Sequence, residues 1–134
     1  MNLSDFKSEL RNWKLTCYKA INFAIGLAAL LIYEFVARPI YRPYIYANKI
    51  NDFHIADTLG NSLGAMATIF FLIALLSNDT VKGNYLLKLG TFSVVVFELA
   101  HPLLGKPIDG WDIVATILTG LFSYVLYNAL FKAK

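Results

Sequence analysis

Charged residues and cysteine are both scarce in this sequence, and each shortage excludes a class of protein. Only 16% of the 134 residues are charged, whereas soluble domains average about 25%. Cys17 is the single cysteine, so an internal disulfide is excluded and the redox compartment stays open. The polar segments between the apolar stretches are too short to fold as a separate soluble catalytic domain. An ordinary soluble enzyme is therefore excluded.

Apolar residues are abundant instead: they make up 57% of the chain and give a mean hydropathy of +0.55. They come in four blocks of about 20 residues, the length that crosses about 30 Å of hydrocarbon as a helix. We therefore expect an all-α polytopic membrane protein, with residues 17–134 forming a four-helix transmembrane domain. Pro39 and Pro43 help to end the first span. The predicted spans are about 17–37, 55–77, 85–104 and 111–131.

The first residues have the periodicity of an amphipathic helix. Apolar side chains recur at steps of three and four residues, at Leu3, Phe6, Leu10, Trp13 and Cys17. This spacing predicts that residues 1–16 form an interfacial helix on the bilayer surface, with Trp13 at headgroup depth. The alternative is an ordinary helical extension of the first span.

The positions of the basic residues predict the orientation of the bundle. Lys and Arg number 12, and the first and third connections between spans hold only four of them, Arg38, Arg42, Lys49 and Lys106. The other eight lie in the N-terminal segment, the second connection and the C-terminal tail, so the positive-inside rule places both termini in the cytoplasm. We expect a multi-pass protein of the bacterial inner (cytoplasmic) membrane. Basic residues beside the spans favour membrane lipid as a partner, and not nucleic acid.

The two predicted hairpins resemble each other in sequence. Residues 33–39 and 97–102 each hold an aromatic residue, a Glu, a short apolar stretch and a basic or imidazole side chain before Pro. We predict two repeated helical hairpins, whose returning spans each carry a small or polar stripe that faces other helices. Gly60 and Gly64 predict a close approach of two helix backbones. The stripes consist of Asn61, Gly64 and Thr68 after Asp57, and of Thr116, Thr119 and Ser123 after Asp112.

This topology gathers ionisable residues at one membrane face. Spans one and three run in the same direction, so their carboxylates lie toward the face at which the returning spans begin. Glu98 lies roughly 10 Å of helix before Gly105, at a depth where an ionised carboxylate needs a partner or a proton. We predict an extracytoplasmic binding cluster made of Glu34, Arg38, Arg42, His54, Asp57, Asn61, Glu98, His101, Lys106, Asp109, Asp112 and Thr116.

The second hairpin resembles the signature region of the VanZ-like membrane proteins. Their pattern is approximately Glu-x-x-Gln on one span, a loop with Arg and an acidic residue, and Asp-x-x-x-Asn-x-x-Gly opening the next span. The residues of this chain at those places are Glu98, His101, Lys106, Asp109, Asp112, Thr116 and Thr119. His101, Lys106 and Thr116 depart from the Gln, Arg and Asn of the pattern. The resemblance implies a role in the cell envelope, in line with the family's association with glycopeptide-antibiotic tolerance, and specifies no reaction.

Glu98 and His101 allow three interpretations. A metal site in a helix bundle uses two Glu-x-x-His elements and further Glu residues, and only one such element is present here, so we assign no metal and no cofactor. A structural pair of Glu98 with His101 or Lys106 would hold helices together. In a headgroup site, basic side chains would contact an anion, and His54 or His101 could act as general acid or base.

The sequence leaves two classes of function open. The first is a VanZ-like envelope protein that binds a lipid or an anionic envelope-precursor headgroup. Since the serines and threonines near the site are explained by helix packing, no nucleophile is evident and binding is favoured over catalysis. The second is an interaction protein, either a small accessory subunit of a membrane complex or a self-assembling, holin-like pore or effector. Its partners would be copies of itself or other membrane subunits.

Overall fold

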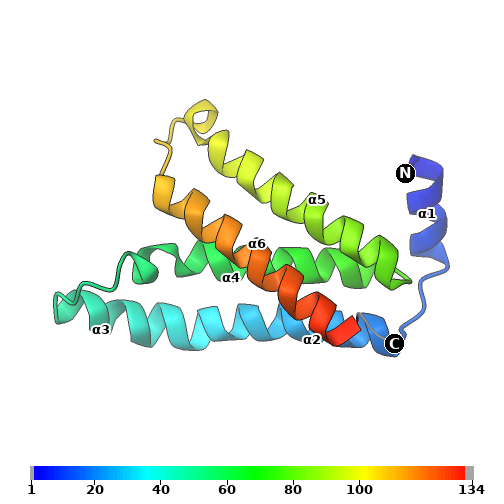
Figure 1. Cartoon of the computed structure of the whole chain (residues 1–134), viewed down its shortest axis with the longest axis horizontal. Helices are drawn as coiled ribbons and strands as arrows, with labels where there is room; N and C mark the ends of the chain where they lie inside the picture. The colour runs from blue at the N-terminus through cyan, green and yellow to red at the C-terminus, as the bar shows by residue number, and fades with distance from the viewer. Residues whose placement is uncertain (1, 132–134) are drawn as a thin grey trace.

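The structure, a computed structural model, describes residues 2–131 and is helical throughout apart from short connections. The prediction of an all-α fold is confirmed (Figure 1). Met1 of the predicted N-terminal helix and the C-terminal tail lysines, Lys132 and Lys134, lie outside the described residues. The elements are α1 (Leu3–Arg11), α2 (Cys17–Ile32), η1 (Tyr33–Tyr41), α3 (Arg42–Ala47), α4 (Ile55–Leu76), α5 (Thr80–Leu99), η2 (His101–Leu104) and α6 (Gly110–Phe131).

Three helical segments are long and apolar enough to cross a membrane. They are Cys17–Ala47, Ile55–Leu76 and Gly110–Phe131, with mean hydropathies of 1.9, 2.0 and 1.7. These candidate spans indicate a multi-pass membrane protein. The fourth long helix, α5, carries Lys82, Lys88 and Glu98 and does not belong to this group.

Helix α4 lies at the centre of the bundle and packs against α2, α5 and α6. Helices α5 and α6 form an antiparallel hairpin on one side of α4, and α1 is set across the end of the bundle where α2 begins (Figure 1). The apolar core lies toward that same end, where the second half of α4 meets the start of α5 and the end of α6. Its buried members are Ile69, Phe70, Ile73, Leu76, Leu86, Leu87 and Tyr127.

The first span does not end near residue 37 as predicted. The helix continues from Cys17 to Ala47, because residues Tyr33–Tyr41 adopt a wider π-helical turn that contains Pro39. Proline has no N–H and clashes with the carbonyl four residues earlier in an α-helix, and the wider i to i+5 winding relieves this conflict. Pro43 follows in the first turn of α3, where its missing N–H costs little. The predicted end of the first span at Pro39 is therefore wrong.

The N-terminal helix ends earlier than predicted and is separate from the first span. Helix α1 stops at Arg11, and α2 begins after Thr16, whose hydroxyl accepts a hydrogen bond from the Lys19 N–H at 3.2 Å. A continuous helical extension of the first span is therefore wrong. The Trp13 indole donates to the carbonyl of Ala74 at 3.4 Å, so this connection is anchored on α4.

The helix starting near residue 85 in the prediction begins at Thr80 and ends at Leu99. Asp79 caps its first turn by accepting a hydrogen bond from the Lys82 N–H at 2.8 Å, a strong start signal that favours the earlier residue. After Leu99 the chain tightens into η2, with Pro102 in its first turn. The hairpin repeat itself stays a prediction.

The predicted close approach at Gly60 and Gly64 is wrong. A Cβ added to Gly64 would meet no atom within 4 Å, and one added to Gly60 would contact only the ring and hydroxyl of Tyr33. The tight glycine contacts are elsewhere: Gly120 on α6 packs against Thr91 of α5, and Gly83 on α5 packs against two tyrosine hydroxyls. Small-residue spacing alone does not tell which face of a helix meets its neighbour.

Candidate functional site

Glu98 and His101 form a buried acid–imidazole pair where α5 ends. Glu98 is only 4% exposed, and His101 Nδ1 lies 3.2 Å from its Oε2 across one helical turn. The orientation is poor for a hydrogen bond, so this buried oxygen has no hydrogen-bond partner. Of the two structural pairings predicted for Glu98, the one with His101 is present, whereas Lys106 lies on the exposed loop before α6.

Two residues from neighbouring helices complete what we call the Glu98 cluster: Glu98, His101, Asp112 and Asn61. Asp112, in the first turn of α6, is one of the charged groups that act electrostatically on Glu98. The Asn61 side chain, from α4, interacts with the Asp112 carboxylate. The consecutive helices α4, α5 and α6 each contribute a polar side chain to this part of the bundle. An arrangement of this kind favours a ligand that donates hydrogen bonds.

The Glu98 cluster borders a groove between α4 and α5. This α4–α5 groove has a volume of about 380 Å³ and runs from Glu98 and Asn61 along small side chains of both helices. The predicted polar stripe of α4 lines the groove and does not pack against a helix backbone, since Gly64 and Thr68 are exposed. The groove offers an apolar, small-residue channel that ends at a buried carboxylate.

A second group of predicted residues meets nearby and is more exposed. In this Asp57 cluster, Asp57 accepts a hydrogen bond from the Tyr46 hydroxyl, and His54 Nδ1 lies 3.4 Å from the other carboxylate oxygen. The Arg42 guanidinium donates to the Tyr46 hydroxyl at 3.4 Å. Because α3 continues the first span as a helix, Arg42 and Tyr46 stand one turn apart and face the start of α4.

The two clusters lie at the same end of the bundle. Figure 1 shows α3, the starts of α4 and α6, and the end of α5 together at the end opposite α1. Trp111, at the start of α6, stacks on the His54 ring with centroids 4.8 Å apart and an interplanar angle of 23°. Asp57 also acts electrostatically on Asp112. The gathering of carboxylates and imidazoles that the sequence predicts at one face is therefore present.

Some residues predicted for the binding cluster lie outside both the Glu98 cluster and the Asp57 cluster. Glu34 and Arg38 pair with each other at 3.3 Å on the outside of η1, with side chains 42% and 65% exposed. Within residues 2–131, neither Glu34 nor Arg38 makes a hydrogen bond or ion pair with a residue of either cluster. Asp109 is exposed and caps the start of α6 by accepting from the Trp111 N–H at 2.9 Å. Thr116 is buried within the bundle, and its hydroxyl has no hydrogen-bond partner.

Two members of the site, Tyr46 and Trp111, were not among the residues predicted from the sequence. The Tyr46 hydroxyl bonds to Asp57, and the Trp111 ring covers His54. The signal for Tyr46 was its spacing of four residues from Arg42, which has meaning only if the helix continues past Pro39. Trp111 carried no such signal, because its contact joins the starts of α4 and α6, which are distant in sequence.

The side chains at this end suit the binding of an organic group. Within residues 2–131, no three His, Cys, Asp or Glu side chains come together in an arrangement that could hold a metal ion. The carboxylates of the Glu98 cluster suit a hydroxyl or amino group, and the Arg42 guanidinium suits a phosphate or carboxylate. Both kinds of group occur together in polar lipid headgroups.

Comparison with known proteins adds no relative. The chain matches none of the protein-family models, none of the curated proteins and none of the solved structures.

Proposed function

We propose that this chain is a four-span protein of the bacterial inner membrane, similar to the VanZ-like proteins, that binds the headgroup of a membrane lipid or lipid-linked envelope precursor. The headgroup enters at the extracytoplasmic end, where its hydroxyl or amino groups reach the Glu98 cluster. Its anionic group meets Arg42, with Lys106 on the loop nearby. The α4–α5 groove receives the adjoining acyl chain.

The burial of Glu98 carries this proposal. A carboxylate that is 4% exposed and has an oxygen without a hydrogen-bond partner is costly unless something satisfies it. Glu98 lines a groove of about 380 Å³ between α4 and α5, a size in the range of small-molecule sites. Ionisable groups at such depth mark functional positions in membrane proteins.

The packing of α5 supports a fourth span. This helix has 20 residues, about 30 Å at 1.5 Å per residue, which equals the hydrocarbon thickness. It packs along both α4 and α6, and short connections join it to each of them. Lys82 and Glu98 lie near its two ends, and Lys88, eight residues after Thr80, has a long side chain that can reach toward the headgroups at the start of the helix. An even number of spans also agrees with both termini lying in the cytoplasm.

Cysteine labelling tests the crossing of α5. In a Cys17→Ser background, Asn78→Cys and Ile108→Cys place single thiols in the connections before and after α5. If α5 spans the membrane, an impermeant maleimide added to intact spheroplasts labels the thiol at position 108 and not that at 78. Equal labelling of both positions would place the two connections on one side and overturn the four-span topology.

Native mass spectrometry of the protein extracted gently from its own membranes tests the binding. We expect a co-purifying lipid or precursor that is lost in Glu98→Gln. The matched control is Glu34→Gln, the same chemical change on an exposed carboxylate outside both clusters, which should retain the ligand. A ligand-free homo-oligomer, or a fixed complex with another subunit, would contradict the proposal and make assembly the function.

A further inference from the structure

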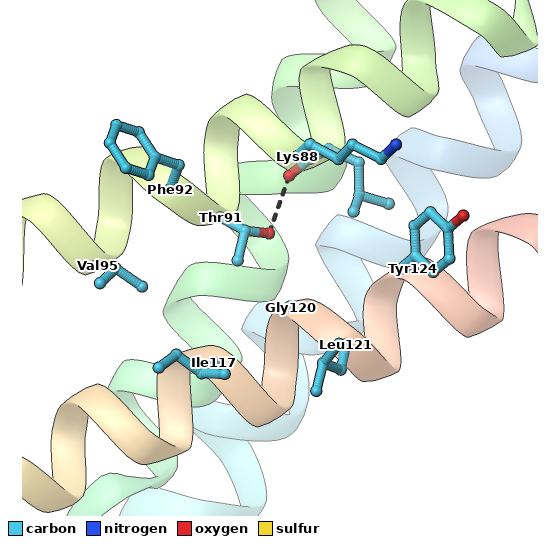
Figure 2. A pocket seen from close by; sticks show the side chains of 9 residues that line it. Lys88, Thr91, Phe92, Val95, Ile117, Gly120, Leu121 and Tyr124 are labelled. Carbon is cyan, nitrogen blue, oxygen red and sulfur yellow. Dashed lines mark hydrogen bonds between the residues drawn. The ribbon is translucent and has the colours of Figure 1, made fainter.

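A second groove lies between α5 and α6. It has a volume of about 470 Å³, and apolar side chains of both helices form most of its walls (Figure 2). Val95 and Phe92 lie on the α5 side, with Ile117 and Leu121 on the α6 side. Along the groove, α5 and α6 meet closely at Gly120, where the Thr91 side chain fits against the glycine. Its shape and lining suit a hydrocarbon chain.

A polar pocket of about 410 Å³ continues this groove toward the end of the bundle that holds α1. Lys88 and Tyr124 line both spaces and therefore mark the boundary between them. Asn84 and Asn128 face each other in the polar pocket, with the Asn84 amide nitrogen 3.4 Å from the Asn128 side-chain oxygen. The Asn84 oxygen is buried and has no hydrogen-bond partner. An apolar groove thus joins a polar pocket at a lysine.

The Lys88 ammonium is available to a ligand. It lies 5.7 Å from the centroid of the Tyr124 ring, a cation–π contact that orients the charge toward the pocket. Lys88 is exposed, and no carboxylate of residues 2–131 lies within ion-pair distance of it. Lys82, one and a half turns earlier, is in contrast paired with Glu9 of α1. A cation at the edge of an apolar groove calls for an anion from the membrane.

We propose that this α5–α6 groove binds an anionic phospholipid of the cytoplasmic leaflet. One acyl chain lies in the apolar groove between Val95 and Leu121, and the phosphate sits at Lys88. The headgroup hydroxyls reach the amides of Asn84 and Asn128. Charge complementarity favours a lipid over a helix of another protein, because a helix in this groove would need its own buried carboxylate opposite Lys88. The proposed phosphate position at Lys88 lies about 15 Å along α5 from Glu98, and none of the residues that line this groove belongs to the Glu98 cluster.

Lipid competition in nanodiscs tests this site. The full chain is reconstituted with equal amounts of phosphatidylglycerol and phosphatidylcholine of the same acyl chains, then released and weighed by native mass spectrometry. Wild type should retain phosphatidylglycerol preferentially. Lys88→Gln should lower this preference about fivefold, the effect of roughly 1 kcal/mol for one lysine near anionic lipid. Lys7→Gln, which removes an exposed charge on α1, should leave the preference unchanged.

A second pair of variants tests the apolar part. Val95→Trp fills the groove and should lower retention of both lipids, whereas Val125→Trp adds the same bulk on an exposed position of α6 outside it and should not. If Lys88→Gln kept the full preference for phosphatidylglycerol, or if Val95→Trp retained both lipids as wild type does, the proposal would be overturned. So would a lipid-free dimer that Val95→Trp dissociates, since a second copy of the chain would then occupy the groove.

Discussion

At the end of the bundle next to α1, polar groups bond to one another across helices, whereas at the opposite end they face grooves and loops. The Tyr18 and Tyr127 hydroxyls, from α2 and α6, lie 2.5 Å apart, and Tyr127 also donates to the Thr80 carbonyl at 3.1 Å. The ring of Phe131 packs against both tyrosines. At the other end, Glu98 has a buried oxygen without a hydrogen-bond partner, and His54 is exposed.

This difference separates the end that holds the apolar core from the end that holds the Glu98 and Asp57 clusters. The apolar core also lies toward the tyrosines, so burial and cross-helix hydrogen bonds stabilise the same region. The opposite end holds the ionisable residues of the two clusters, and one buried oxygen of Glu98 there has no hydrogen-bond partner. Functional sites often keep groups that cost stability. Mutations at the two ends should therefore separate stability from ligand binding.

Gly83→Ala should give the largest loss of stability. An added Cβ would overlap the hydroxyls of both Tyr18 and Tyr127, so the tyrosine contact must open. Overpacking of this kind costs about 1–3 kcal/mol. Thermal unfolding in detergent micelles, followed by circular dichroism, measures the loss. Gly64→Ala is the matched control, since its Cβ meets open space, and we expect a change within about 0.5 kcal/mol. Similar losses for both variants would contradict the packing described here.

The contrast between these two glycines shows what the sequence could and could not predict. Helices α4 and α6 begin and end within a residue or so of the predicted spans, because long apolar runs there are bounded by polar residues. Which face of α4 meets another helix depends on its rotation within the bundle. No local pattern specifies that rotation, so the Gly60–Gly64 interface was wrong.

The sequence likewise predicts part of the candidate site and leaves part of it open. The Glu98–His101 pair follows from a spacing of three residues on one helix. The bond from Tyr46 to Asp57 joins two helices across a loop, and the predicted break after residue 37 concealed it. The pairing of Glu34 with Arg38 is also local, but the symmetry of the proposed repeat placed Glu34 in the site beside Glu98. Sequence therefore predicts contacts within a helix better than contacts between helices.

Tyr127→Phe should have the next largest effect. It removes the hydroxyl that joins α6 to Tyr18 and to the Thr80 carbonyl while keeping the ring in the core. Interhelical hydrogen bonds in membrane proteins contribute about 0.6 kcal/mol on average and up to about 1.7 kcal/mol, and we expect a loss in the upper half of this range because two bonds are affected. A double-mutant cycle with Tyr18→Phe measures the coupling. Additive losses would show that the two hydroxyls act independently.

Glu98→Gln should leave stability unchanged or slightly raised while it abolishes ligand retention. The neutral amide removes a buried charge that has no well-oriented hydrogen bond. We expect the free energy of unfolding, measured in the same micelles, to fall by no more than about 0.5 kcal/mol. A loss above about 1 kcal/mol, the value of a typical hydrogen bond, would instead identify the Glu98–His101 pair as a structural tie.

Glu34→Gln should have the smallest effect on both measurements and thereby fixes the baseline for the comparison. Its partner Arg38 is 65% exposed, and the pair spans one turn of η1, so the expected loss is about 0.3–0.5 kcal/mol, as for exposed pairs on one helix. The co-purifying ligand should be retained in full. If Glu34→Gln released the ligand as Glu98→Gln does, the binding surface would extend along η1, and the site would follow the sequence repeat after all.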